Sequence, residues 1–292
     1  MAGYSFKRVD LMDAQGSLPL TGLLDLNKPF VHPASVVGNG PLWIGQATRK
    51  VHCLLFELSD RVVPNWFGVA VPDGVTDLSE VILYFHPIPG QANYHDRDYA
   101  AKAGKWRANL PNYMWRMGMQ IALSGKPRAL IMPFFTSASS GNLGMFAANW
   151  KAIVNSLLSL THAQIAPADD IAPVFYNLTL ASFSAGIEYL DAFLRLAPDY
   201  RQHLREIYDF DGSFSAESGH LSGGLLARGG GARVVIYDQV DLGKSAAVLP
   251  NRFHLPLGRW SGLSSEVKNR DDVHQAINRH MLYHALATSF RD

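Results

Sequence analysis

Short apolar runs that alternate with segments of helical periodicity are the feature of this sequence that most constrains its fold. The run EVILYFH at 80–86 is β-branched, aromatic and almost wholly apolar, as expected of a strand buried on both faces. By contrast, GMFAANWKAIVNSLLSL at 144–160 places its large apolar residues at helical spacing. This alternation predicts an α/β fold, with a mostly parallel central β-sheet flanked by helices on both faces.

The same alternation continues through most of the chain. Further strands are predicted at 50–58, 65–71, 128–135, 174–183, 205–212, 232–238 and 252–258. Further helices are predicted at 99–123, where Pro111 interrupts the pattern, at 185–197, near 216–228 and at 271–290. Residues 1–48 are rich in Gly and Pro and show no clear period. We therefore expect an N-terminal arm at 1–48, packed on one domain at 49–292.

Composition narrows the classes of partner and location. With 292 residues, 48% of them hydrophobic, the chain can bury a large core, and its net charge of +1 gives no electrostatic reason to expect nucleic acid or an anionic membrane surface as a partner. No apolar run reaches the ~20 residues that span a bilayer, and Lys7 and Asp10 interrupt the apolar start where a signal peptide would be continuous. The lone Cys53 forms no internal disulfide. A cytoplasmic location is expected, with export by a route that reads no such signal left open.

The residues that follow each predicted strand are the candidates for function, because ligands of parallel sheets bind beyond the carboxyl ends of the strands. SFSAG at 182–186 joins the strand at 174–183 to the next helix. A nucleophile on a tight strand-to-helix turn needs small residues on both sides, and Ser182 and Gly186 meet that need around Ser184. The following helix dipole favours negative charge there. The alternative is a small-residue joint without chemistry.

HPIPG at 86–90 follows the strand at 80–86 in the same way. A loop that stabilises an oxyanion must offer a backbone N–H early in the loop. Because Pro87 and Pro89 have no N–H, Ile88 is the best donor in this stretch. A stiff surface turn is the alternative interpretation of the loop.

Together, HPIPG, SFSAG and the late Asp and His residues resemble the α/β-hydrolase superfamily. Its members place a G-x-S-x-G elbow after the fifth strand and an oxyanion loop after the third. The resemblance covers about residues 50–290 by order of elements, which implies that 49–292 is a catalytic domain. Two positions depart from the pattern: Ser182 replaces the first Gly of the elbow, and Pro87 stands where the family often has Gly.

The resemblance also implies a catalytic triad in the chain order Ser, Asp or Glu, His. With Ser184 as nucleophile, His274 is the expected base, because it begins the last helix directly after the last strand. Three aspartates compete for the acid: Asp241, in the loop after the strand at 232–238, ranks first, Asp211 second and Asp238 third. Each of the three also suits a turn or a helix cap.

The backbone N–H groups of Ala185 and Ile88 would then bind the oxyanion of the tetrahedral intermediate. No cofactor or metal is expected. DLGKSA at 241–246 lacks the first Gly of a phosphate loop, and GGLLARGGG at 223–231 lacks G-x-G-x-x-G. His280 and His284 could share a face of the last helix, but the H-E-x-x-H motif of a zinc site is absent, which favours a structural role for both.

The predicted function is a serine hydrolase that cleaves a small carboxylic ester through an acyl-enzyme intermediate. Aromatic and Met side chains crowd 94–119 and 134–150, which fits an apolar, lipid-like acyl group, although ordinary core packing explains at least half of them. Two alternatives stay open: a non-catalytic relative that uses the fold for binding, and an amidase or peptidase of the same fold.

Overall fold

The computed structural model describes residues 6–9, 51–58, 64, 66–86, 114, 117–134, 143–168, 173–213, 224–239, 251–260 and 267–289. Their strands are β1 (Phe6–Val9), β2 (Val51–Leu58), β3 (Trp66–Pro72), β4 (Glu80–Phe85), β5 (Ala129–Phe134), β6 (Asn177–Phe183), β7 (Leu204–Phe210), β8 (Arg233–Asp238) and β9 (Arg252–His254). The named helices are α5 (Gly144–Ile165), α6 (Gly186–Leu196), η3 (Tyr200–Gln202), α8 (Leu257–Trp260) and α9 (Arg270–Ala287), and 117–124 is also helical.

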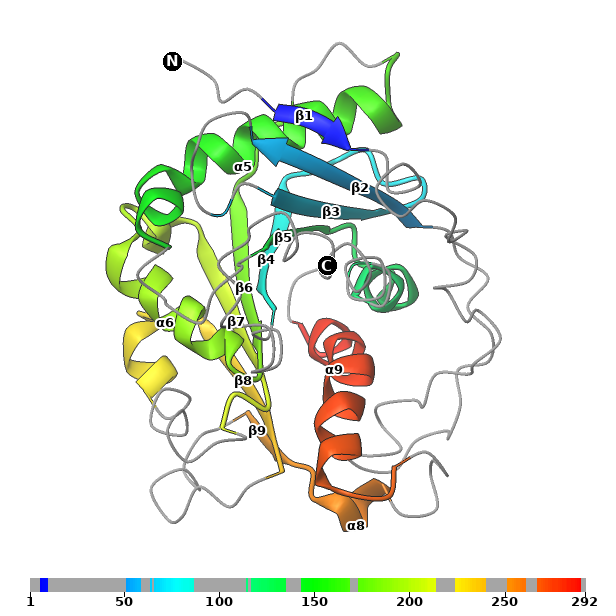
Figure 1. Cartoon of the computed structure of the whole chain (residues 1–292), viewed down its shortest axis with the longest axis vertical. Helices are drawn as coiled ribbons and strands as arrows, with labels where there is room; N and C mark the ends of the chain where they lie inside the picture. The colour runs from blue at the N-terminus through cyan, green and yellow to red at the C-terminus, as the bar shows by residue number, and fades with distance from the viewer. Residues whose placement is uncertain are drawn as a thin grey trace, which may run out of the picture.

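The strands of the described residues form one sheet in the order β1-β2-β3-β5-β4-β6-β7-β8-β9 (Figure 1). In the sheet order, the strands β5-β4-β6-β7-β8-β9 are parallel to one another, whereas β1–β2, β2–β3 and β3–β5 are antiparallel pairs. With β1 set aside, the crossover between β4 and β5 and the antiparallel β3 give the strand arrangement of the α/β-hydrolase fold. The predicted fold class is therefore confirmed.

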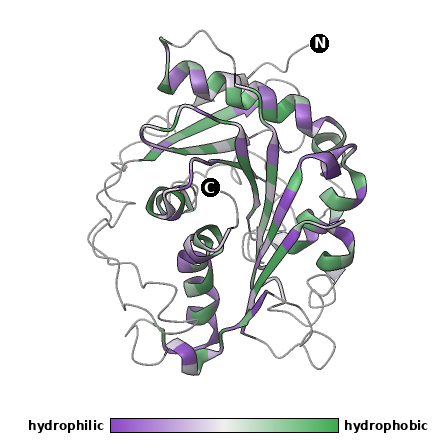
Figure 2. Cartoon of the chain, turned by 180° about the vertical axis from the view of Figure 1, so that it is seen from behind, coloured by the Kyte–Doolittle hydropathy of each residue, from purple (hydrophilic) through white to green (hydrophobic). Residues whose placement is uncertain are grey.

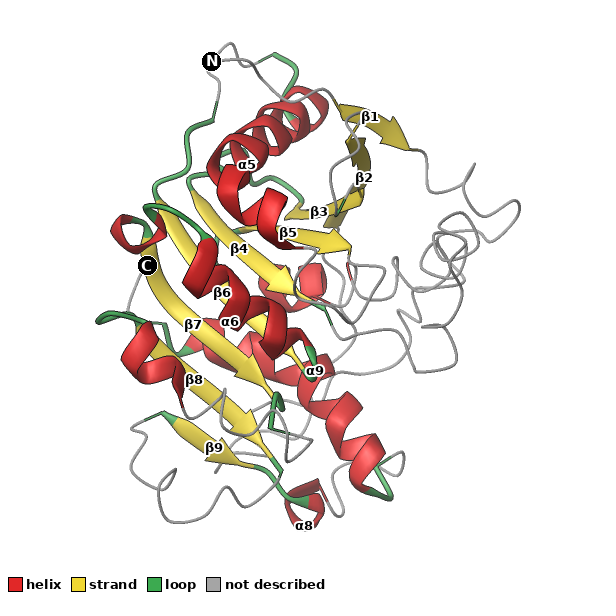
Figure 3. Cartoon of the chain, turned by 60° about the vertical axis from the view of Figure 1, so that its left-hand side comes forward, coloured by secondary structure: helices red, strands yellow, loops and turns green. Residues whose placement is uncertain are grey.

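Each face of the sheet has its own hydrophobic core. Along β4, Val81 and Leu83 point into the core formed with α5 and α6, while Ile82 and Tyr84 point into the core formed with α9. The helices accordingly lie on opposite faces, α5 and α6 on one and α9 on the other (Figures 1 and 3). Colouring by hydropathy shows hydrophobic residues along the central strands, with hydrophilic residues interspersed on the helices (Figure 2). A strand with two buried faces needs an almost continuous apolar sequence, as 80–86 has.

The predicted order of strands and helices is found in the described residues, with two differences, at 252–258 and in the arm. The predicted strand at 252–258 ends at His254, and α8 begins at Leu257. The helix expected near 216–228 is described only at 224–228, and of the one expected at 99–123 only 114 and 117–123 are described. Within the arm, where no regular element was expected, Phe6–Val9 forms β1, because the open edge of β2 supplies the hydrogen-bonding partner that so short a strand requires. None of the helices in the described ranges combines the length and apolarity needed to cross a bilayer.

Candidate active site

Ser184 occupies a strained turn between β6 and α6. Its φ of 55° is left-handed, a conformation that costs a non-Gly residue about 1 kcal/mol or more. Two backbone hydrogen bonds hold the turn. The Ser184 N–H donates to the carbonyl of Phe210 on the neighbouring strand at 3.0 Å, and the Ser184 carbonyl accepts from the Ile187 N–H at 3.1 Å. The side chain is therefore presented half-buried at the carboxyl edge of the sheet, at the start of α6.

Gly186 allows this turn to pack tightly on the neighbouring strand. A Cβ at this position would overlap the carbonyl oxygen of Phe85 and come within 2.9 Å of that of His86. The start of α6 thus lies directly against the end of β4, the strand that leads into HPIPG. The sequence requirement for a small residue after Ser184 has a steric cause in this contact.

Asp211 follows β7, the neighbour of β6, in a second left-handed turn with φ of 54°. Its carboxylate is fully buried and accepts three hydrogen bonds. Oδ2 accepts from His274 Nδ1 and from Gln239 Nε2, both at 2.7 Å, and Oδ1 accepts from the Gln239 backbone N–H at 3.2 Å. Asp211 and His274 are 63 residues apart in sequence, so the fold alone brings them together.

His274 lies in the first two turns of α9, whose start is fixed by a capping box. Asn269 accepts from the Asp272 N–H, and the Asp272 carboxylate accepts from the Asn269 N–H. The imidazole packs against the ring of Phe183, with 4.4 Å between centroids. Because Phe183 immediately precedes Ser184, the imidazole lies beside the strained turn, with Nδ1 held by a carboxylate.

The other predicted site residues fall into two groups. Asp241 and Ile88 lie outside the described residues, so their roles stay predictions. Ala185 is the residue before the first turn of α6, where helix N–H groups lack intrahelical acceptors. Asp238 is fully buried and binds Arg252 Nε at 2.5 Å and His254 Nδ1 at 2.8 Å, so it is not the partner of His274.

Polar contacts that no sequence pattern indicates hold α9 in place. Tyr84 on β4 donates to the Asn278 side chain, although 194 residues separate the two. The Gln120 amide donates to the Asn278 carbonyl at 3.1 Å and accepts from the Tyr283 N–H at 3.1 Å. Asn278 lies one helical turn beyond His274, so these contacts fix the height of the imidazole over the sheet.

A buried charge cluster anchors the far end of α9. Glu206 on β7 pairs with Arg128 at 2.8 Å and Arg233 at 2.9 Å, and it accepts from the Ser289 hydroxyl at 3.0 Å just after α9. Burial by itself would raise the pKa of Glu206, but the Arg128 guanidinium and the Tyr208 hydroxyl outweigh it and hold that pKa below its usual range. Both ends of α9 are therefore tied to the parallel strands.

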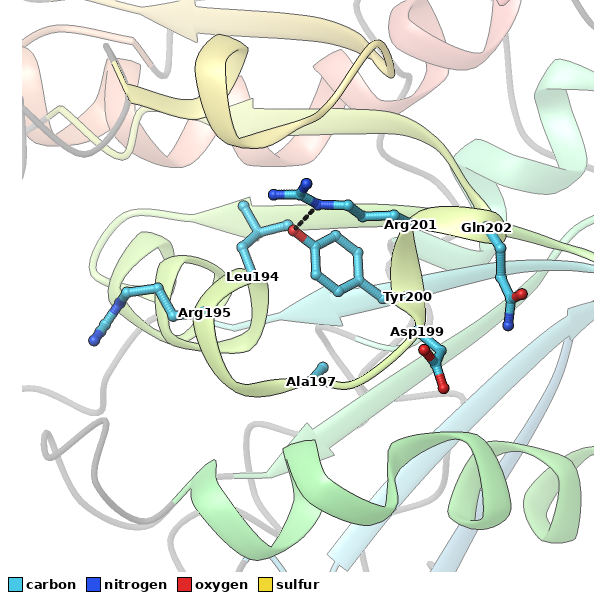
Figure 4. Close-up of a pocket in the computed structure, with 7 residues that line it drawn as sticks. All are labelled: Leu194, Arg195, Ala197, Asp199, Tyr200, Arg201 and Gln202. Atoms are coloured by element: carbon cyan, nitrogen blue, oxygen red, sulfur yellow. Dashed lines mark hydrogen bonds between the residues drawn. The ribbon is translucent and has the colours of Figure 1, made fainter.

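Two further observations bear on a binding site. A shallow hollow of about 470 Å³ lies at the C-terminal end of α6, where Arg201 Nε donates to the Tyr200 hydroxyl at 3.3 Å (Figure 4). Its lining is Leu194, Arg195, Ala197, Asp199, Tyr200, Arg201 and Gln202. Since α6 has 11 residues and rises about 1.5 Å per residue, this hollow is about 16 Å along the helix from Ser184. The part of the chain that the structure describes contains no cluster of metal-ligating side chains.

The described aromatic and Met side chains between 114 and 150 lie mostly in the core. Those that are fully or almost fully buried are Met114, Met117, Met119, Phe134, Phe146 and Trp150. For these residues the core interpretation holds, and Met145, at 55% exposure, is the exception. The remaining aromatic and Met residues of 94–119 and 134–150 lie outside the described residues.

Comparison with known proteins adds little to this geometry. No family model matches the sequence, and no curated protein matches it. Among solved structures, the chain is similar to the rice cell wall degrading esterase LipA from Xanthomonas oryzae (12% identity, TM-score 0.39, 70% of this chain and 48% of that one). It is also similar to an arylesterase (10%, 0.42, 88% and 89%) and to a putative hydrolase from Legionella pneumophila (12%, 0.36, 98% and 70%). The chain spans about half the length of LipA. At TM-scores below 0.5 these similarities carry no argument about chemistry.

Proposed function

We propose that the protein is a serine hydrolase that cleaves carboxylic esters, with Ser184 as nucleophile, His274 as general base and Asp211 as the acid of the triad. One observation carries the proposal. The carboxylate of Asp211 lies 2.7 Å from His274 Nδ1, and the imidazole rests on the residue that precedes Ser184. A carboxylate, an imidazole and a serine on a strained turn are the three parts that acyl transfer requires.

Each group has a defined task in this mechanism. Neutral His274 accepts the Ser184 hydroxyl proton at Nε2 as Oγ attacks the ester carbonyl. Asp211 accepts the hydrogen bond of Nδ1–H, which keeps the imidazole in the tautomer with Nε2 free to act as a base, and stabilises the imidazolium that forms. His274 then returns the proton to the leaving alkoxide. A water molecule, activated by the same base, releases the acid and restores Ser184.

The oxyanion would be bound by the backbone N–H groups of Ala185 and Ile88. Ala185 stands at the N-terminal end of α6, where the helix dipole also favours developing negative charge. The tight contact of Gly186 with the end of β4 brings that strand, which leads toward Ile88, beside the turn. Removing one such donor typically costs about 3 kcal/mol of transition-state stabilisation. The substrate proposed from the sequence is an ester with an apolar acyl group.

Covalent labelling tests nucleophile and reaction class together. A fluorophosphonate probe is expected to label the wild-type protein at Ser184, and mass spectrometry of the labelled peptide locates the adduct. Ser184→Ala abolishes labelling, whereas Ser156→Ala, which removes a hydroxyl on the outer side of α5, labels at the wild-type rate.

Substrate assays then separate the alternatives. A labelled protein that cleaves nitrophenyl esters but not the matching anilides is an esterase, whereas cleavage of both would make it an amidase, because an enzyme that attacks an anilide also attacks the more reactive ester. A wild-type protein that resists the probe and cleaves no short- or medium-chain nitrophenyl ester would refute the proposal and favour a binding role for the fold.

A further inference from the structure

A buried carboxylate other than Asp211 connects the two turns of the candidate site. Ser182 on β6 and Asp209 on β7 are direct neighbours across the parallel pair, and both are fully buried. The Ser182 hydroxyl donates to Asp209 Oδ1 at 3.3 Å, and the Gly212 backbone N–H donates to the same oxygen at 3.1 Å. One oxygen therefore joins the strand before Ser184 to the turn that contains Asp211.

The spacing relates this pair to the site. Ser184 lies two residues beyond Ser182, and Asp211 lies two residues beyond Asp209. Ser182 and Asp209 are the second-last residues of β6 and β7, so the buried pair lies directly before the two turns that carry Ser184 and Asp211. Both functional residues adopt left-handed backbone, with φ of 55° and 54°. Such conformations persist only where the surroundings hold them.

The surroundings of Gly212 show how closely the Asp209 carboxylate packs against the turn that contains Asp211. A Cβ on Gly212 would overlap Asp209 Oδ1, so the position after Asp211 has no room for a side chain. The hydrogen bond from Gly212 N–H to Asp209 spans three residues and encloses Asp211 between its ends. Asp209 thereby holds the turn whose backbone positions the Asp211 carboxylate next to His274.

We infer that Asp209, with Ser182 as its donor, is a positioning residue for the triad; the inference rests on the proposed function. It touches no reacting atom, and it acts by holding the Ser184 turn and the Asp211 turn in register with each other. The inference also gives a reason for the departure at position 182. Where the hydrolase elbow has Gly, this chain carries a hydroxyl, and that hydroxyl donates to the buried Asp209 carboxylate.

Kinetics of matched variants test the role. Asp209→Ala is expected to lower kcat for a nitrophenyl ester about 100-fold, and Ser182→Ala about 10-fold, with KM within about 2-fold, because small displacements of catalytic groups are costly and no substrate contact is removed. Asp209→Asn keeps an oxygen that accepts both hydrogen bonds and is expected to recover kcat to within about 10-fold of wild type. Thr179→Val removes a nearly buried hydroxyl from the other end of β6 and leaves kcat within about 2-fold, as a control for lost stability.

A spectroscopic readout keeps this inference separate from the proposed function. The Nδ1–H proton of His274, hydrogen-bonded to a carboxylate, gives a low-field NMR resonance that needs no turnover. The resonance is expected to shift or broaden in Asp209→Ala and Ser182→Ala and to persist in Thr179→Val. If Asp209→Ala fails to fold, Ser182→Ala decides the question.

Two results have opposite meanings. A wild-type resonance and wild-type kcat in both Ser182→Ala and Asp209→Ala would overturn the positioning role while leaving the hydrolase intact. A shifted resonance in a protein that reacts with neither probe nor ester would support the positioning of Asp211 and overturn the hydrolase.

Discussion

Replacing Asp211 by Asn is the sharpest test of the triad, because the structure limits what the new amide can do. The carboxylate accepts from His274 and Gln239 Nε2 at one oxygen and from the Gln239 N–H at the other. Asn has only one oxygen. If that oxygen faces His274, the NH2 group faces the Gln239 N–H; if it faces the Gln239 N–H, the NH2 group opposes His274 and forces the wrong tautomer. Each orientation places a donor against a donor.

The size of the effect follows from the charge that is lost. In the first orientation His274 keeps its tautomer but the imidazolium loses a carboxylate about 4 Å from its centre, which is worth about 4 kcal/mol at an effective dielectric constant of about 20. That corresponds to about 10³ in kcat. In the second orientation the base is blocked, and a loss of about 10⁴ is expected, the size measured for the equivalent change in a serine protease. We therefore expect kcat to fall by about 10³ to 10⁴.

Nitrophenyl ester turnover and the rate of fluorophosphonate labelling measure this loss. Asp238→Asn is the matched control, because Asp238 is equally buried but binds Arg252 and His254. It is expected to lower stability by about 3–5 kcal/mol and to leave kcat within about 3-fold in the folded protein. If Asp211→Asn retained more than about a tenth of wild-type kcat, the reasoning would be refuted. A large loss in Asp241→Asn would then restore the acid ranked first from the sequence.

Three further predictions concern packing, pH and reactivity. Gly186→Ala is expected to cost about 1–3 kcal/mol of unfolding free energy and to lower kcat, because its Cβ pushes the turn off the Phe85 carbonyl; thermal melts and ester assays check both. The ion pair with Arg128 holds the pKa of Glu206 below its ordinary value of 4.5. The stability that ionised Glu206 contributes is therefore present above about pH 4.5 and is lost as the pH falls through the lowered pKa. In Glu206→Gln, the unfolding free energy, measured by urea titration, is expected to fall less steeply toward acid pH than in the wild type. Burial raises the pKa of the Cys53 thiol to about 12, so little reactive thiolate is present in the native protein at pH 8. Iodoacetamide is therefore expected to modify Cys53 far more slowly in the native than in the unfolded protein, measured by mass spectrometry. Equal rates would contradict this prediction.

The central strands could be predicted because the sequence of each strand alone indicates that both of its faces are buried. A strand such as β4 sends Val81 into one core and Ile82 into the other, and this demands a continuous apolar sequence that is visible without its neighbours. The four residues of β1, FKRV, have no such signature. They form a strand because the edge of β2 offers unpaired backbone groups, and such an edge is a property of the folded sheet.

The candidate site also contains residues that the local sequence indicates and residues that only the folded chain identifies. Ser184 could be singled out because the turn imposes small residues on its immediate neighbours, which are local in sequence. The partner of His274 could not be singled out, since Asp211 comes directly after β7, Asp238 ends β8 and Asp241 comes three residues later in the sequence, all in an order the triad allows. The choice between Asp211 and Asp238 depends on the left-handed turn after β7 and on the pairing of Asp238 with Arg252, neither of which any spacing encodes.

Ser184 and Asp211 are two of the three described non-glycine residues with left-handed backbone, and in the proposed mechanism they set thermal stability against reactivity at the same two positions. Glycine at either would relax the backbone by up to about 1 kcal/mol, partly offset by the greater freedom of the unfolded chain, and would remove the reactive group. A lineage that used this fold only to bind a partner would gain by drifting to glycine there, as proteins freed from catalysis can trade activity for stability. Under the proposed mechanism, the backbone strain at Ser184 and Asp211 is the stability that the fold gives up to keep a hydroxyl and a carboxylate at these two turns.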